Sequence, residues 1–116
     1  MQTTAKQSDR AFSFVPINKR QMKPRTVGIT EIRGPYYTPV GMHYLKDLFD
    51  TMGDYIDTLK FAGGSFVLIP RRALQELIEF CHQQDVLVST GGFIERVLIR
   101  ARSGNPVYSG VQAGWL

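Results

Sequence analysis

The chain has 116 residues, of which 43% are hydrophobic and 21% are charged. This length allows one domain with its own core, because domains cluster around roughly 100 to 150 residues, and it excludes a large multidomain enzyme. The longest apolar runs, such as FVLI at 66–69, are far shorter than the ~20 residues that span a bilayer, so we expect no membrane segment.

The net charge of +4 is unevenly distributed. Residues 1–26 carry six basic residues and one acidic residue, a net charge of +5, whereas the remaining residues carry eight basic and nine acidic ones, a net charge of −1. A nucleic-acid module would hold its basic patch on the folded part, so this distribution argues against a nucleic-acid partner. We expect residues 1–25 to form a basic, disordered and solvated arm.

Cysteine content and the N-terminus bear on the cellular compartment. A single cysteine, Cys81, rules out an intramolecular disulfide framework, and the N-terminus lacks the continuous apolar segment of a secretory signal. Both features favour a reducing, cytoplasmic location. The basic arm also leaves a mitochondrial targeting role open, although it shows no clear amphipathic face.

From Thr26 onward, strand-like and helix-like runs alternate. The β-branched run VGITEIR (27–33) predicts a strand that ends before Gly34 and Pro35. A helical apolar face then follows and stops at Gly53, a residue typical of helix C-termini. The members of this face are Met42, Leu45, Leu48, Phe49 and Met52.

The same alternation occurs twice more. YIDTLKF (55–61) and VLVST (86–90) predict the second and third strands, and Pro70 is placed where a helix begins. Apolar residues at helical spacing follow each strand. They are Leu74, Leu77, Ile78 and Cys81 after the second strand, and Ile94, Val97, Leu98 and Ala101 after the third.

This β-α-β-α-β-α order predicts an α/β fold over residues 26–102, with three parallel strands, right-handed crossovers and helices packed on the sheet. Residues 103–116 show neither period and predict an irregular tail. In such folds, functional residues gather at the carboxyl ends of the strands.

Charged side chains stand at these strand ends. Glu31 and Arg33 close the first strand, Lys60 closes the second, and Thr90 closes the third with Glu95 shortly after it. Because strand side chains alternate, Glu31 and Arg33 share one face. If Lys60 faces the same interior, two cations and a carboxylate meet at one rim, a pattern that suits a small, highly anionic substrate.

Glycines follow the second and third of these strands, namely Gly63, Gly64, Gly91 and Gly92. Glycine lets a ligand approach the backbone closely, and backbone N–H groups near a helix start favour anions. Two simpler interpretations remain open. The glycines can be ordinary turn residues, and the strand-end cations can be rim ion pairs.

Other reactive side chains have structural explanations. His43 and His82 lie within predicted helices without metal-ligand spacing, so we expect both on the surface. Cys81 lies on an apolar stripe, which predicts a buried structural thiol. Asp54 and Asp57 flank a strand start, where a solvated or capping role is expected.

Three segments carry a family resemblance: KPRTVGITEIRGPYYT, LFDTMGDYIDTLKFAGGSFVLIP and VLVSTGGFIE. They resemble the phosphosulfolactate synthase family, most closely its eukaryotic branch, which includes plant heat-stress-associated proteins. The resemblance runs from about Lys23 to about Leu98. It implies a (β/α)8 TIM barrel, of which this chain would form about three βα units.

The archaeal enzymes of this family add sulfite to phosphoenolpyruvate with magnesium. The resemblance implies that Lys60 is the family lysine after the second strand, and that Arg33 stands where the archaeal enzymes have the lysine of a DKG motif. It therefore implies Lys60 and Arg33 as catalytic residues. Glu31 and Glu95 are the implied Mg²⁺ ligands, Glu31 being only the nearest carboxylate and Glu95 part of a GG-E element. The implied substrate-binding residues are Gly63, Gly64, Ser65, Thr90, Gly91 and Gly92.

A closed barrel of this type needs roughly 250 residues and eight strands. We therefore expect a truncated family member that is too short to act alone as a carbon–sulfur lyase. Its unpaired sheet edges would favour self-association. The alternative is a non-catalytic, stress-related or anion-binding scaffold protein of the same family.

Overall fold

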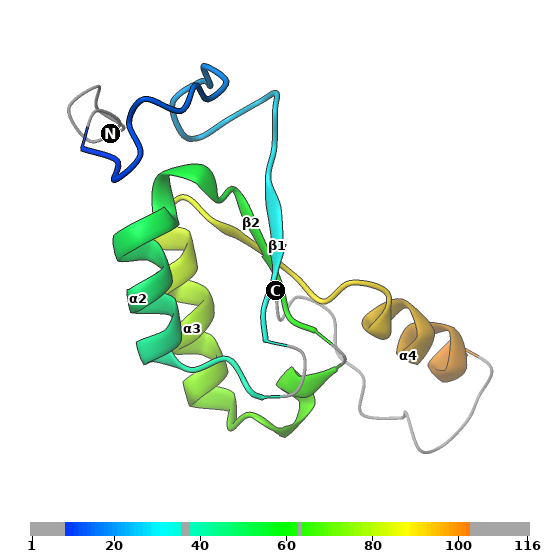
Figure 1. Cartoon of the computed structure of the whole chain (residues 1–116). Helices are drawn as coiled ribbons and strands as arrows, with labels where there is room; N and C mark the ends of the chain where they lie inside the picture. Colours follow the sequence, from blue (N-terminus) through cyan, green and yellow to red (C-terminus); the bar gives the residue numbers. More distant parts are fainter. Residues whose placement is uncertain (1–8, 36–37, 63, 103–116) are drawn as a thin grey trace.

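The computed structural model describes residues 9–35, 38–62 and 64–102. Three short strands form one sheet in the order β1-β2-β3 and alternate with helices (Figure 1). Gly63 and the predicted tail at 103–116 lie outside the described residues. The elements in chain order are β1 (Glu31–Arg33), α2 (Met42–Met52), a 3-10 helix (Gly53–Tyr55), β2 (Thr58–Lys60), a 3-10 helix (Ser65–Leu68), α3 (Arg71–Gln83), β3 (Leu87–Ser89) and α4 (Phe93–Arg102).

Both strand pairs are parallel, as the sequence predicts. Arg33 lies opposite Lys60, which lies opposite Ser89, so the three strands end level with one another. The first strand is shorter than the predicted 27–33, because Gly28 has a φ of +67° and therefore cannot continue an extended run. The described residues thus form a partial α/β fold with a three-stranded parallel sheet.

Helices α2 and α3 cover one face of the sheet side by side, with the rings of Phe49 and Phe80 5.6 Å apart (Figure 1). The apolar stripe predicted for α3 is buried throughout, and in α2 Leu45 and Phe49 are buried. The strands contribute Leu59, which is fully buried. The core consists of Val40, Leu45, Phe49, Ile56, Leu59, Phe61, Phe66, Leu74, Leu77, Ile78, Cys81 and Val86.

Helix α4 differs from the expectation that every helix packs on the sheet. It lies apart from α2 and α3, on the other side of the strands (Figure 1). Its first residue, Phe93, packs edge-on against Phe66 with ring centroids 5.6 Å apart, whereas Leu98 of the predicted stripe is exposed. The helix therefore contacts the body at its first turn. No helix within the described ranges is long and apolar enough to cross a membrane.

A buried ion-pair cluster lies at the amino end of β2. Asp57 accepts hydrogen bonds from Arg25 at 2.8 Å, from Arg20 at 3.1 Å and from the backbone N–H of Thr30 at 2.8 Å. The Arg25 side chain is fully buried and that of Asp57 is 6% exposed. Of the solvated or capping role predicted for Asp57, the solvated alternative is wrong, because the carboxylate is buried and accepts a backbone N–H. Residues 20–25 are also not a free arm, since Arg20 and Arg25 bond to Asp57. Partnered charges can be buried because the hydrogen bonds replace those lost from water.

Lys23 ties the same segment to both packed helices. Its ammonium donates to the carbonyl oxygens of Gly53 at 3.0 Å and Gln84 at 2.7 Å, the C-caps of α2 and α3. A cation is favourable there because helix C-termini carry partial negative charge. Burial lowers the pKa of Lys23, although Asp57 and other nearby carboxylates oppose that shift. Residues 20–25 thus act as a strap across the amino end of the sheet.

Removing the carboxylate of Asp57 should strongly destabilise the fold. The variant Asp57→Ala leaves Arg25 buried without its 2.8 Å partner, so we expect a loss of about 3–5 kcal/mol in the free energy of unfolding. Urea denaturation followed by circular dichroism measures this loss. The control is Glu76→Ala, which breaks an exposed Arg72–Glu76 pair and should cost less than about 0.5 kcal/mol. An equal loss of unfolding free energy in the two variants would contradict the view that the buried Arg25–Asp57 pair stabilises the fold more than an exposed pair does.

Stability should also depend on pH through Asp57. Burial raises the pKa of this carboxyl, but the Thr30 hydrogen bond and Arg25 outweigh burial, so the net pKa lies below the model-peptide value of 3.8. A depressed folded-state pKa means that the contribution is fully present above roughly pH 4 and is lost as the pH falls below it. We expect the urea midpoint to fall on acidification, and to fall less in Asp57→Asn. Identical pH profiles for the two proteins would contradict this expectation.

Candidate functional site

A hollow of about 300 Å³ lies at the carboxyl ends of the strands. It gathers five of the residues that the sequence singled out, although they come from β1, β2 and the loop after β3. The lining consists of Arg33, Lys60, Phe61, Ala62, Thr90, Gly91, Gly92 and Phe93. Parallel pairing explains this gathering, because it brings every strand's carboxyl end to the same edge.

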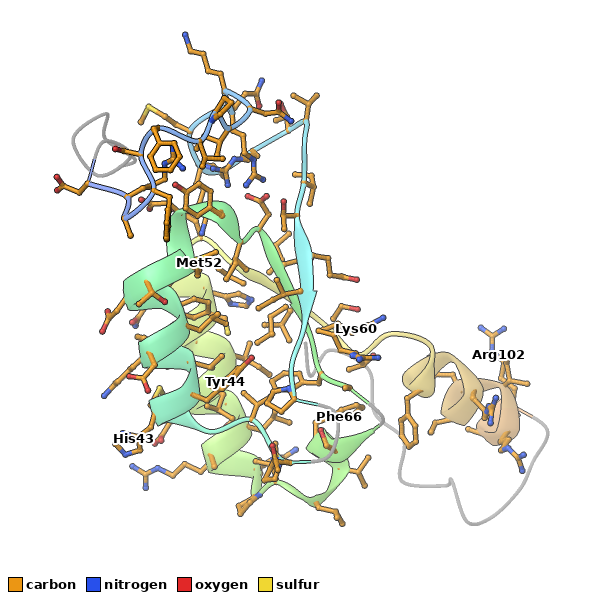
Figure 2. All side chains as sticks on the ribbon, viewed as in Figure 1. His43, Tyr44, Met52, Lys60, Phe66 and Arg102 are labelled. Carbon is orange, nitrogen blue, oxygen red and sulfur yellow. The ribbon has the colours of Figure 1, made fainter. Side chains whose placement is uncertain are left out.

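Two cations dominate the charge of the hollow. Arg33 and Lys60 are partners in the parallel register, at the ends of β1 and β2. The backbone around Lys60 is fixed on both sides, since its carbonyl accepts from the Gly34 N–H at 2.9 Å and the next N–H, of Phe61, donates to Ser89 at 2.8 Å. Figure 2 shows Lys60 beside the strand ends on the side of α4. This geometry can attract a small anion.

The loop after β3 forms another part of the lining. Thr90 is 8% exposed and Gly91 has a φ of +61°, a left-handed conformation that favours glycine. The Gly91 N–H donates to Ser89 Oγ at 3.0 Å. A Cβ atom added to Gly91 would lie 2.9 Å from Cδ of Lys60, so the lysine stem rests on this glycine.

The loop after β2 has a different place from the one expected of a substrate-binding loop. Gly64 and Ser65 do not line the hollow. Gly64 has a φ of +74°, and an added Cβ would lie 2.7 Å from the ring of Phe93. The Ser65 hydroxyl is buried without a hydrogen-bond partner in the described part of the chain. Gly64 therefore makes room for the ring of Phe93, which is one of the residues that line the hollow.

Phe93 is a lining residue that sequence reasoning did not single out. It directly follows the two glycines of the third loop. Its ring reaches back to Gly64 and Phe66 of the second loop, and so joins two loops around the hollow. The signal available in the sequence was its position after the glycine pair, where a helix begins.

The implied metal ligands do not assemble into a magnesium site within the described residues. Glu31 is exposed, accepts a hydrogen bond from Thr58 Oγ1 at 3.1 Å and does not line the hollow. The side chain of Glu95 lies outside what the structure describes. No cluster of three or more His, Cys, Asp or Glu residues suited to a metal occurs in the described ranges. Magnesium typically binds through one or two carboxylates together with substrate phosphates, so Glu31 alone fits that role poorly.

The remaining reactive groups lie away from the hollow. His43 and His82 are exposed, and Cys81 is fully buried, as the sequence predicts. Burial raises the pKa of the Cys81 thiol to about 11. The thiolate that a nucleophile requires is therefore rare near neutral pH.

An arrangement of strand-end cations around a hollow at the carboxyl edge of a parallel sheet is typical of α/β proteins that bind small anions. Comparison with known proteins identifies the family. Residues 18–109 match the model of (2R)-phospho-3-sulfolactate synthase (ComA), and the chain therefore belongs to this family.

A curated relative is Protein HEAT-STRESS-ASSOCIATED 32 of Arabidopsis thaliana, which is 44% identical over 92 residues. These residues are 79% of the present chain and 31% of the plant protein, so the chain spans about a third of that relative. No solved structure matches the chain. The matches confirm the resemblance stated from the strand-end motifs.

The burial of Cys81 predicts its reactivity. With a pKa of about 11 and no exposure, we expect no alkylation by iodoacetamide in the native chain at pH 8, and rapid alkylation after unfolding in urea. Mass spectrometry of the intact protein measures both rates. Modification of the native chain at the rate of a free thiol peptide would contradict the placement of Cys81 in the core.

Proposed function

We propose that the hollow at the strand ends binds phosphoenolpyruvate or a similar small, multiply charged anion, as part of a phosphosulfolactate synthase-type site. The observation that carries the proposal is the pairing of Arg33 with Lys60 at the carboxyl ends of adjacent strands, both lining one hollow. Family membership supplies the candidate ligand, since the family name denotes the synthesis of a phosphorylated sulfonate.

The chemistry of the family reaction suits these residues. Addition of sulfite to phosphoenolpyruvate brings together an anionic nucleophile and a substrate with phosphate and carboxylate charges. Cations fixed before the reaction lower that repulsion and stabilise the negative charge that develops on the carboxylate side. We assign Lys60 and Arg33 to this electrostatic clamp, and Lys60 is also a candidate donor of the proton that the carbon finally receives.

Magnesium enters only through the family resemblance. Metal ions neutralise phosphate charge in such reactions, but the described residues contain no cluster of three or more His, Cys, Asp or Glu residues suited to a metal. We therefore derive no step through the metal. The clamp formed by Lys60 and Arg33 can bind an anion without it.

A non-catalytic scaffold protein is the second candidate. It is favoured by the similarity to a protein named for heat stress and by the lack of an assembled metal-ligand cluster in the described residues. Such a protein would bind the anion at the same cations without converting it. Turnover, rather than binding, separates the two candidates.

Binding can be tested with phosphoenolpyruvate as the probe. Isothermal titration calorimetry of the 116-residue chain should show saturable binding, and Lys60→Ala should weaken it about tenfold or more, because a charged hydrogen bond contributes roughly 1.5–3 kcal/mol. The control is Lys46→Ala, which removes an exposed cation of α2 far from the lining of the hollow. Equal affinity in the wild type and Lys60→Ala would refute the site.

Sulfite consumption in the presence of phosphoenolpyruvate and magnesium then tests catalysis. We expect no measurable turnover by this chain, because displacement of reacting groups by about 1 Å can cost on the order of a hundredfold and no cluster of three or more candidate metal ligands is assembled in the described residues. Turnover that Lys60→Ala abolishes would show that the chain is itself a synthase.

A further inference from the structure

We propose that Gly91 is a positioning residue for Lys60: its bare Cα forms the surface on which the lysine stem lies, and this contact holds the ammonium group in the hollow. The inference rests on the proposed anion site and concerns how that site is kept in shape. It replaces the expectation that Gly91 binds the substrate through its backbone.

The contact is extensive for a single glycine. From the position that a Cβ of residue 91 would take, Cδ of Lys60 is 2.9 Å away, Cγ is 3.5 Å away and Cε is 3.8 Å away. Three successive carbons of the stem therefore lie along the face of Gly91 that any other residue would fill. A separation under 3.0 Å is shorter than real Cβ contacts, so a side chain at 91 would displace Lys60.

Gly91 is itself held firmly. Its N–H donates to Ser89 Oγ at 3.0 Å, and Ser89 is the strand partner of Lys60 across the β2–β3 ladder. The loop is thus fixed to the strand beside the one that carries Lys60. Because this N–H already has an acceptor, it is not the group that receives the anion.

The contact with Gly91 reduces the conformational freedom of the Lys60 side chain. A free lysine stem samples many rotamers, and ordering them on ligand binding reduces affinity. A stem already packed along a fixed loop loses less freedom when the anion arrives, which is the effect of preorganisation. Gly91 would therefore strengthen anion binding without contacting the anion.

Glycine scanning can separate this role from backbone strain. Gly28 has a φ of +67°, close to the +61° of Gly91, but an added Cβ there meets no atom within 4 Å. Gly28→Ala therefore introduces the same unfavourable conformation without touching Lys60. It is the matched control for Gly91→Ala, and comparison of the two isolates the contact with the lysine.

The first measurement needs no ligand. Nuclear Overhauser effects between the Lys60 methylene protons and the Gly91 Hα protons should be present in the wild type and in Gly28→Ala. In Gly91→Ala, the Lys60 methylene shifts should move to those of a mobile lysine. Absence of the contacts in the wild type, or unchanged Lys60 shifts in Gly91→Ala, would overturn the proposal whether or not the chain binds phosphoenolpyruvate.

The second measurement is a double-mutant cycle on the dissociation constant of phosphoenolpyruvate. We expect Gly91→Ala to weaken binding on the order of fivefold or more and Gly28→Ala to leave it within about twofold. In the Lys60→Ala background, Gly91→Ala should have no further effect. An equal effect in both backgrounds would show that Gly91 does not act through Lys60.

A third variant keeps the test decisive if Gly91→Ala does not fold. Ser89→Ala removes the oxygen that accepts the Gly91 N–H, and it should weaken both the Lys60–Gly91 Overhauser effects and the binding of phosphoenolpyruvate. If the Lys60–Gly91 Overhauser effects and the affinity for phosphoenolpyruvate are both unchanged in Ser89→Ala, the proposal is overturned. Loss of binding in every protein, with the Lys60–Gly91 contact intact, would instead count against the proposed function alone.

Discussion

The sheet depends on Asp57, a carboxylate buried beside two arginines just before β2. Its side chain accepts from Arg25 and Arg20, and its backbone joins the outer strands, because its N–H donates to Thr30 at 2.9 Å and its carbonyl accepts from Leu87 at 3.0 Å. One residue thus connects the strap, the entry to β1 and the start of β3. These contacts at the amino end of β2 help to fix the register of the three strands. The register in turn determines which residues lie side by side at the carboxyl ends.

The two ends of β2 use cations for different purposes. At the amino end, the buried Arg25 is neutralised by Asp57 at 2.8 Å, and such a pair is costly to break but contributes little to ligand chemistry. At the carboxyl end, Lys60 is half-buried and lines a hollow together with Arg33. Two cations at one hollow raise the local positive potential, which is the basis of the proposed anion site. The same strand therefore carries a buried ion pair at one end and the cation of the proposed site at the other.

Much of this organisation was predictable because it depends on periodicity and chain order. The stripe on α3 and the grouping of Lys60 with Arg33 follow from helical spacing and from parallel pairing. The cluster around Asp57 was not predictable, because Arg25 and Asp57 are 32 residues apart and a basic segment resembles a solvated arm in the sequence. The role of Gly91 was equally hidden, since glycine after a strand fits any turn and only the position of the Lys60 stem distinguishes it.

In the described part of the chain, the two faces of the sheet differ in what covers them. Parallel sheets are usually covered on both faces, yet here α2 and α3 cover one face and Leu87 is 65% exposed on the other. Leu87 is in register with Thr58 and Glu31, and two residues further on Ser89 is in register with Lys60 and Arg33. This face therefore carries polar and charged side chains along its whole length, unlike the near-continuous apolar strands of a parallel sheet that is buried on both faces.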